Sequence, residues 1–284
     1  MGGALALGKA RADGGAHVDP TTTPRDGTTA FEDRGRGTVV VLLHGYPFSG
    51  AMWRDQVDAL VDRHRVIVPD LRGHGGTAPR GEISTMEDMA DDVVALLDAL
   101  EEPDPVVVGG LSMGGYVALA LTRRHPGRVR ALVLADTRPQ ADDDVAQRAR
   151  EDTARKVVSA GLESVVEGML GKLLAPTTLT ERPDVVGRVR AMILGTTRQG
   201  AAAALRGMAA RRDQSDLLTT LGIPTLIVVG SEDVLTPPAD AMAMHRAIAG
   251  SCLAVIEGAG HVSNLERPVE FNRALVDFVG TLDA

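Results

Sequence analysis

The chain is poor in cysteine and has no long apolar run. Its 284 residues include one cysteine, Cys252, so no disulfide can form within the chain. This composition is compatible with a reducing compartment, and we expect a cytoplasmic location. No apolar run approaches the length that a bilayer-spanning helix needs, so we expect no membrane association through such a helix.

Excess positive charge and metal-binding patterns are also missing. The formal net charge is −8 and acidic and basic residues are interspersed, which gives no electrostatic basis for binding nucleic acid or an anionic membrane. The sequence has no H-x-H or H-E-x-x-H pattern and no cysteine cluster, so we expect no metal ion.

What the sequence does have is an alternation of short apolar runs and helical patterns. The runs are β-branched and apolar on both faces, as in parallel strands that helices cover on each side. An antiparallel strand is predicted at 28–33, before the first of these runs. The alternation predicts an α/β fold with a doubly wound, mostly parallel sheet. The apolar runs cover residues 38–43, 66–69, 106–110, 131–135, 225–230 and 253–258.

One region departs from this alternation. Residues 138–216 contain helical patterns, no strand-like run and no Phe, Tyr or Trp. We therefore predict a helical insertion after the fourth parallel strand. The core then comprises residues 28–137 and 217–284, and residues 1–27, rich in Gly, Ala and Thr, form a mobile N-terminal tail. Within the core, Ser84 and Glu87 have the spacing of a capping box, which predicts a helix start at Ser84.

A serine lies between glycines where a predicted strand ends. Gly110-Leu111-Ser112-Met113-Gly114 matches the pattern G-x-S-x-G, with a strand before it and a helix after it. Such a turn raises a serine hydroxyl at the carboxyl edge of a sheet. The alternative is that Ser112 only fits a tight turn between strand and helix.

A nucleophilic serine needs a base, and His261 is the candidate. It lies in a loop bounded by glycines directly after the last predicted strand, at the same edge as Ser112. The alternative is a loop histidine that bonds locally. Other histidines have ordinary structural positions: His17 in the tail, His64 and His125 in surface-like Arg-rich stretches, and His245 in an amphipathic helix.

The imidazole in turn needs a carboxylate that fixes its tautomer. Asp233 follows the strand before the one that precedes His261, and we favour it. Asp136 also follows a strand at this edge and is the rival candidate, whereas Glu232 is expected to point away.

Two backbone amides are candidates for stabilising an oxyanion. The amide of Tyr46 follows the first core strand and that of Met113 follows the serine, so the two could bind one oxygen. We expect His44 beside them to hydrogen-bond the loop rather than to act as a ligand or base. A further Gly-rich turn carries Asp70, Arg72 and His74, whose charges we expect to lock neighbouring loops.

Together these segments resemble the α/β-hydrolase superfamily. The segments are HGYP, DLRGHG, GLSMGGY, GSEDVLTPP and GAGHVSNLERP, in the family's order, and the resemblance spans about residues 28–282. It implies that Ser112 is the nucleophile, Asp233 the triad acid and His261 the base, with the amides of Tyr46 and Met113 as the oxyanion hole and 138–216 as a helical cap. It implies a small-molecule substrate and no cofactor.

Within this superfamily the sequence looks most like the small serine esterases, enol-lactonases and cofactor-free perhydrolases. A serine at position 112 excludes the alkyl-enzyme mechanism of relatives that carry Asp there. The resemblance implies a carboxylic ester or lactone hydrolase. The alternatives are hydrolysis of a carbon–carbon or amide bond on the same triad, a perhydrolase, or a ligand-binding or cyclase relative. The oligomeric state is left open.

Aromatic residues near the expected reaction centre come from the core. Phe48, Trp53 and Tyr116 are the candidate substrate-binding residues, and the alternative is that they only pack the loops. If at least two of them line the pocket, it should suit a compact, uncharged acyl or lactone group, with chains of about two to six carbons.

Overall fold

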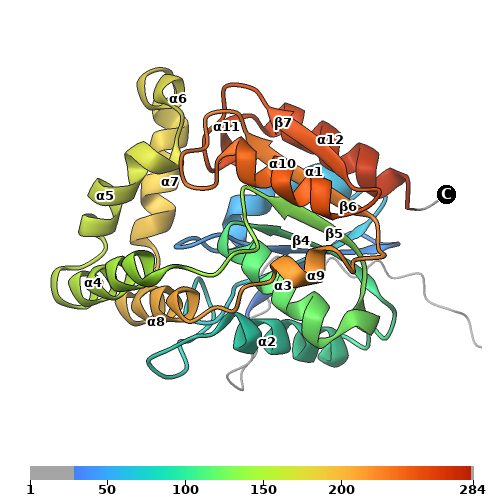
Figure 1. Ribbon diagram of the computed structural model, residues 1–284, viewed down its shortest axis with the longest axis horizontal. Coiled ribbons are helices and arrows are strands. Elements are labelled where there is room, and N and C mark those ends of the chain that lie inside the picture. Colours follow the sequence, from blue (N-terminus) through green and yellow to red (C-terminus); the bar gives the residue numbers. More distant parts are fainter. Residues whose placement is uncertain (1–28, 283–284) are drawn as a thin grey trace, which may run out of the picture.

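The computed structural model describes residues 29–282, and seven strands in this part of the chain form one sheet (Figure 1). The strand order is β1-β3-β2-β4-β5-β6-β7, and only β1 runs antiparallel to its neighbour. The tail predicted for residues 1–27 lies outside the described residues. The strands are β1 (Phe31–Arg34), β2 (Val39–Leu43), β3 (Arg65–Pro69), β4 (Val106–Leu111), β5 (Val129–Ala135), β6 (Thr225–Gly230) and β7 (Cys252–Ile256).

The sheet confirms the predicted fold class. From β2 the chain first adds β3 on one side and then β4 on the other, so the sheet is doubly wound. The register aligns Leu43 with Gly110, Leu111 with Ala135, and Gly230 with Ile256. The carboxyl ends of the parallel strands therefore meet at one edge, and the loops after them lie together there.

Helices cover both faces of the sheet. In Figure 1, α2 and α3 pack together below it, and α1 and α12 pack together above it. The helices that flank the sheet are η1 (Gly50–Trp53), α1 (Arg54–Leu60), α2 (Met86–Ala99), α3 (Met113–Arg124), η2 (Pro126–Arg128), α10 (Pro238–Ala247), α11 (Ser263–Glu266) and α12 (Pro268–Gly280).

The chain between β5 and β6 contains helices and loops but no strand, and most of its helices extend beyond the sheet, on the left of Figure 1. Within it α4 and α8 pack against each other, and α5 packs against α7. This insertion follows the fourth parallel strand, as the sequence predicts. Its helices are α4 (Asp144–Ala160), α5 (Glu163–Leu173), α6 (Pro176–Glu181), α7 (Pro183–Leu194), α8 (Arg198–Ala209) and α9 (Ser215–Leu218).

The start of α2 differs from the prediction. Thr85, not Ser84, caps the helix: its hydroxyl accepts from the amide of Asp88 at 3.0 Å, and the Asp88 carboxylate accepts from the amide of Thr85 at 3.3 Å. Ser84 is instead docked on α8, where its amide donates to Ala203 O at 3.0 Å. A Cβ on Gly207 would lie 1.7 Å from the Ser84 carbonyl oxygen, so tertiary packing delays the helix by one residue.

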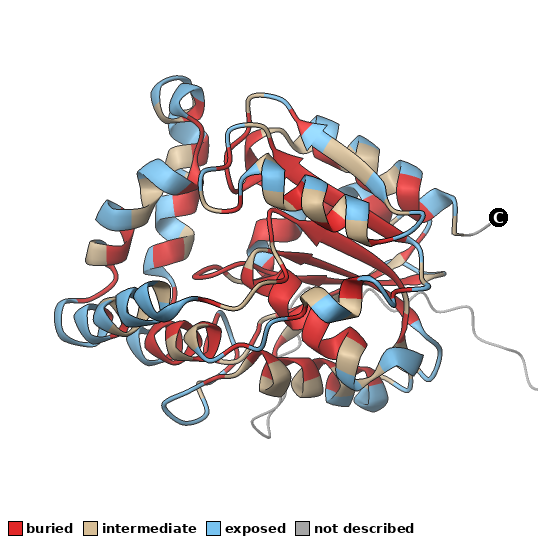
Figure 2. Cartoon of the chain, in the orientation of Figure 1, coloured by how far each residue is buried: buried red, intermediate tan, exposed pale blue. Residues whose placement is uncertain are grey.

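The core lies on both faces of the central strands. β2, β4 and β6 are buried along their whole length (Figure 2). β7 is only partly covered, contrary to the expectation of burial on both faces, because it is an edge strand. His64, expected at the surface, is buried at the turn before β3, where the chain of Gly35 approaches its carbonyl group.

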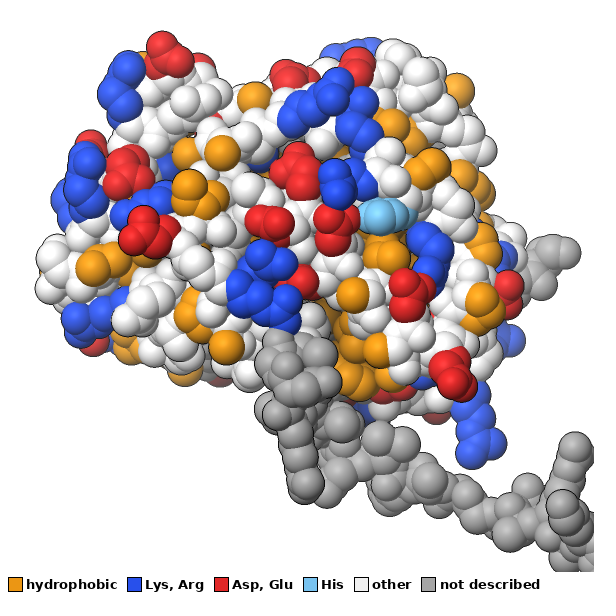
Figure 3. Space-filling model, turned by 90° about the horizontal axis from the view of Figure 1, so that it is seen from below, with side chains coloured by type: hydrophobic (Ala, Val, Ile, Leu, Met, Phe, Trp, Pro, Cys, Tyr) orange, Lys and Arg blue, Asp and Glu red, His pale blue; other side chains and the backbone are white. Residues whose placement is uncertain are grey.

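The surface carries both signs of charge. Figure 3 shows acidic and basic side chains interspersed over one face, and ion pairs such as Arg72–Asp92 at 2.8 Å join neighbouring segments. Over residues 29–282, no helix combines the length and apolar character needed to cross a membrane. The same residues contain no group of three or more His, Cys, Asp or Glu side chains placed to hold a metal ion.

Candidate active site

Ser112 occupies a strained turn between β4 and α3. Its backbone has φ 54° and ψ −113°, a combination that costs a non-glycine residue about 1–3 kcal/mol. The flanking glycines make the turn possible. A Cβ on Gly110 would lie 2.2 Å from Gly114 O, and one on Gly114 would lie 2.1 Å from Leu43 O. The glycines of the G-x-S-x-G pattern are therefore steric requirements.

The end of the neighbouring strand β5 fixes the backbone of this turn. The amide of Ser112 donates to Ala135 O at 2.9 Å, and the hydroxyl of Thr137 donates to Ser112 O at 2.9 Å. The Ser112 side chain is half-buried at the N-terminus of α3, where the helix dipole favours negative charge. The hydroxyl is thus held where charge can develop on it.

His261 connects Ser112 to a carboxylate. Its Nε2 lies 2.8 Å from Ser112 Oγ, and its Nδ1 lies 2.8 Å from Asp233 Oδ2. A carboxylate only accepts, so Nδ1 donates to Asp233 and Nε2 is free to accept the serine hydroxyl. The imidazole is buried, with 4% of the residue exposed. This arrangement can activate a serine for attack on a carbonyl group.

The Asp233 carboxylate is saturated with hydrogen bonds. Oδ1 accepts from the amides of Leu235 at 2.8 Å and Thr236 at 3.0 Å, and Oδ2 accepts from the Thr236 hydroxyl at 2.6 Å as well as from His261. Burial by itself raises the pKa of Asp233, but the hydrogen bonds from His261 and Thr236 outweigh it and hold that pKa below its usual value. The group therefore stays ionised beside the imidazole.

Asp136 is also buried at this edge but has different partners. Its Oδ1 accepts from the amide of Gly230 at 2.8 Å, and its Oδ2 accepts from the Ser263 hydroxyl at 2.5 Å. Burial, and then the nearby charge of Asp233, raise the pKa of Asp136 well above its usual value. Of the two carboxylates that the sequence left as rivals, the structure places Asp233 on His261. Glu232 is exposed to solvent.

Two backbone amides near Ser112 are candidates for binding an oxyanion. The amide of Tyr46 lies in the loop after β2, and that of Met113 comes directly after Ser112. Within residues 29–282 neither donates a hydrogen bond to the protein, so both remain available. His44 holds the first of these loops: Nδ1 donates to Gly45 O at 2.9 Å, and Nε2 accepts from the amide of Leu71 at 2.9 Å. Burial lowers the pKa of His44 to about 4, so the ring is neutral and structural.

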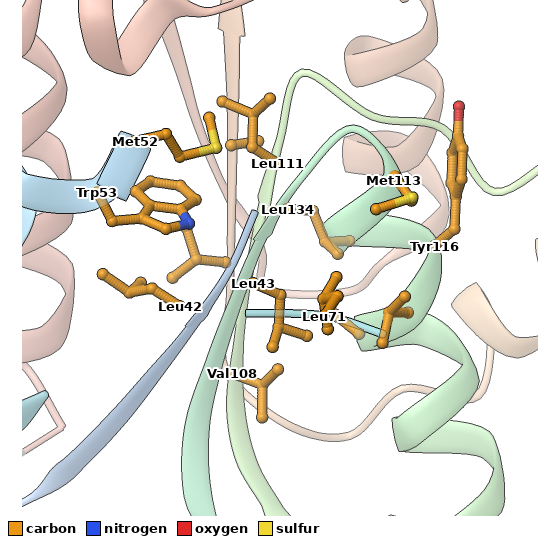
Figure 4. Packing of buried hydrophobic residues seen from close by; sticks show 14 of the residues in the cluster. Leu42, Leu43, Met52, Trp53, Leu71, Val108, Leu111, Met113, Tyr116 and Leu134 are labelled. Atoms are coloured by element: carbon orange, nitrogen blue, oxygen red, sulfur yellow. The ribbon is translucent and has the colours of Figure 1, made fainter. Parts of the chain in front are cut away.

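The three aromatic candidates lie in different surroundings. Phe48 and Trp53 are each 1% exposed, and the Trp53 ring packs 6.0 Å from that of Phe271. Figure 4 shows the indole beside Leu42 and Met52, which favours a packing role. The Tyr116 hydroxyl points away from this aliphatic cluster (Figure 4).

Tyr116 instead lines a small pocket between the core and the insertion. The guanidinium of Arg211 lies over its ring at 4.3 Å. Leu119 and Arg138 line the same pocket. Of the three aromatic candidates, Tyr116 is the one that lines this pocket, which Ser112, Asp233 and His261 do not line.

The inserted helices hold the loop of His261. The amide of His261 donates to Leu173 O, at the end of α5, at 2.9 Å. The buried carboxylate of Glu266 accepts from the amide of Gly260 at 2.7 Å and from that of Ala175 at 2.8 Å. Sequence reasoning missed Glu266 and also Thr137, because no local pattern marks a residue whose partners are distant in the chain.

Comparison with known proteins shows the family to which the chain belongs. The sequence model of the alpha/beta hydrolase fold matches residues 38–268. A 3-oxoadipate enol-lactonase of Acinetobacter baylyi is 29% identical over 261 residues, covering 91% of this chain and 96% of the relative. A pimeloyl-[acyl-carrier protein] methyl ester esterase of Neisseria meningitidis is 33% identical over 250 residues, covering 86% and 78%. The malate-bound structure of a thermophilic esterase from Thermogutta terrifontis is 40% identical with a TM-score of 0.89, covering 94% of this chain and 99% of that one.

Proposed function

Because the chain belongs to the alpha/beta hydrolase fold family, we propose that it is a serine hydrolase that cleaves a carboxylic ester or lactone through an acyl-enzyme. The observation that carries this proposal is the continuous chain of hydrogen bonds from Ser112 through His261 to Asp233. The family's hydrolysis of esters and lactones is represented by the enol-lactonase and the esterases among the relatives.

The first half of the reaction forms the acyl-enzyme. His261 Nε2 takes the hydroxyl proton as Ser112 Oγ attacks the carbonyl carbon, and Asp233 stabilises the imidazolium. The amides of Tyr46 and Met113 hold the tetrahedral oxyanion. When the carbon–oxygen bond breaks, the leaving alcohol takes the proton from His261; in a lactone this oxygen stays tethered to the acyl group.

The second half releases the acid. His261 removes a proton from water, whose oxygen attacks the acyl carbon, and the same amides hold the second oxyanion. Collapse of this intermediate returns the proton from His261 to Ser112 Oγ and frees the carboxylic acid. All groups in both steps belong to the protein, the substrate or water.

We also propose residues 138–216 as a cap and Tyr116 as a substrate contact. The insertion bonds the base loop directly at Leu173, and its Ala175 amide donates to Glu266 on α11, which supports a place for it over the site. Tyr116 lies on α3 four positions after Ser112 and lines a pocket between the core and the insertion, which supports the contact role. Phe48 and Trp53, which are fully buried, are assigned to packing.

The nucleophile is the direct test. Ser112→Ala should lower kcat for p-nitrophenyl acetate by several orders of magnitude and abolish labelling by a serine-directed phosphonate, with unchanged circular dichroism. Ser159→Ala, on the exposed side of α4, is the matched control and should behave as wild type. A Ser112→Ala protein that kept more than about a tenth of the turnover would refute the mechanism.

A further inference from the structure

Two consecutive residues after β5 contact the loops of all three proposed triad members. Thr137 acts on the nucleophile: its hydroxyl donates to Ser112 O at 2.9 Å, and its side chain fills the space beside Gly115, where a Cβ would lie 2.5 Å from Oγ1. The turn of Ser112 is therefore packed and bonded to this residue from the side of β5.

Asp136 acts on the other two loops. Its Oδ1 accepts from the amide of Gly230, three positions before Asp233, and its Oδ2 accepts from the hydroxyl of Ser263, two positions after His261. The two loops also touch directly, since a Cβ on Gly230 would lie 2.1 Å from Gly260 O. One fully buried carboxyl group thus joins the acid loop to the base loop.

Asp136 makes these contacts in a strained and crowded position. It is one of three non-glycine residues with positive φ in the described chain, at 44°. Two further carboxyl groups, those of Asp233 and Glu266, lie close enough to oppose its ionisation, and burial acts in the same direction to raise its pKa. The hydrogen bonds to Gly230 and Ser263 therefore explain its position better than an attraction between charges does.

We propose that Asp136 and Thr137 are positioning residues for the hydrolase reaction, a role that rests on the function proposed above. Asp136 sets the distance between Asp233 and His261, and Thr137 sets Ser112 against them. They touch neither substrate nor the transferred proton. Neither residue takes part in the acyl-transfer steps, in which Asp233 is the carboxylate that hydrogen-bonds His261.

The test compares two substitutions at position 136. Asp136→Ala removes both hydrogen bonds and should lower kcat by about tenfold to a hundredfold with little change in KM, because small displacements of reacting groups are costly. Asp136→Asn keeps an acceptor for the Gly230 amide, and the Ser263 hydroxyl can turn to accept from its NH2 group, so kcat should stay within about threefold of wild type.

The pH profile of kcat/KM distinguishes a positioning role of Asp136 from a role of its negative charge. Its acid limb reports protonation of the base in the free enzyme. If Asp136 acts only through its hydrogen bonds, Asp136→Asn should leave this limb at the same pH. If Asp136 acted as a carboxylate, the exchange would remove a negative charge beside the His261–Asp233 pair and move the limb to lower pH, which would overturn the proposal.

Three further variants provide a control and a test that does not depend on the folding of Asp136→Ala. Asp33→Ala is the control, because it also removes a carboxylate that bonds a neighbouring strand, but at the β1 edge of the sheet; its kcat should match wild type. Thr137→Val and Ser263→Ala each remove one hydroxyl and should each lower kcat severalfold, even if Asp136→Ala fails to fold.

Different results would overturn the positioning role and the proposed function. If Asp136→Ala, Thr137→Val and Ser263→Ala keep the kcat of wild type and only their melting temperatures fall, these residues stabilise the fold and do not position the triad. If kcat falls equally in Asp136→Asn and Asp136→Ala, the negative charge of Asp136 is what the reaction needs, and this result also overturns the positioning role. If wild-type protein shows no Ser112-dependent turnover of esters or lactones, the proposed function itself fails first.

Discussion

At the scale of single residues, the four hydrogen bonds accepted by Asp233 decide what a substitution there does. Asp233→Asn keeps the size of the group, but its NH2 cannot accept, and it favours the imidazole tautomer that leaves no acceptor for Ser112. By analogy with other Ser-His-Asp triads, the expected loss in kcat is on the order of 10⁴. Steady-state kinetics on p-nitrophenyl acetate measure it.

The neighbouring acid supplies the control for this residue. Glu232 is exposed, so Glu232→Gln should retain wild-type kcat. If Asp233→Asn kept more than about a tenth of the turnover, Asp233 would not be the triad acid.

At the scale of elements, Glu266 joins α11 to the inserted helices. Both carboxylate oxygens accept from backbone amides, those of Gly260 and Ala175, so both must be acceptors. Glu266→Gln turns an NH2 group toward one of these amides and should lower the free energy of unfolding by about 1–3 kcal/mol. Urea denaturation measures the change.

Glu270 is the matched position for this test, because it lies exposed on α12. Glu270→Gln should leave the unfolding free energy within about 0.5 kcal/mol of wild type. Equal stability of the two variants would show that the contact of Glu266 with the insertion carries no stabilisation.

At the scale of the whole molecule, the arrangement of core and insertion limits the space for substrate. The insertion bonds the base loop at Leu173 and contributes no aromatic residue, and only a small pocket lies beside Tyr116 between the insertion and the core. In a long groove each buried methylene would add about 0.8 kcal/mol, and kcat/KM would rise steadily with chain length. We expect kcat/KM to peak at acyl chains of about two to six carbons.

A series of p-nitrophenyl esters from acetate to palmitate tests this expectation. A fall beyond hexanoate agrees with a compact pocket. A continued rise to palmitate contradicts it and indicates a long groove under the insertion.

Local sequence was enough to predict the alternation of strands and helices, the all-helical insertion, and the turn of Ser112. These features depend on neighbours in the chain: β-branched runs form strands, and Gly110 and Gly114 are required within two residues of the serine. The carboxyl ends of parallel strands also had to meet at one edge, so the sequence could propose Ser112, His261 and an acid between them.

Which groups actually meet depends on the tertiary structure. His261 bonds Ser112 across 149 positions, Asp233 rather than Asp136 reaches the imidazole, and Glu266 reaches Ala175 across 91 positions. Docking on α8 moved the cap of α2 from Ser84 to Thr85, and core packing enclosed Trp53. Such contacts arise from the packing of whole elements, whose relative positions no local pattern of residues encodes.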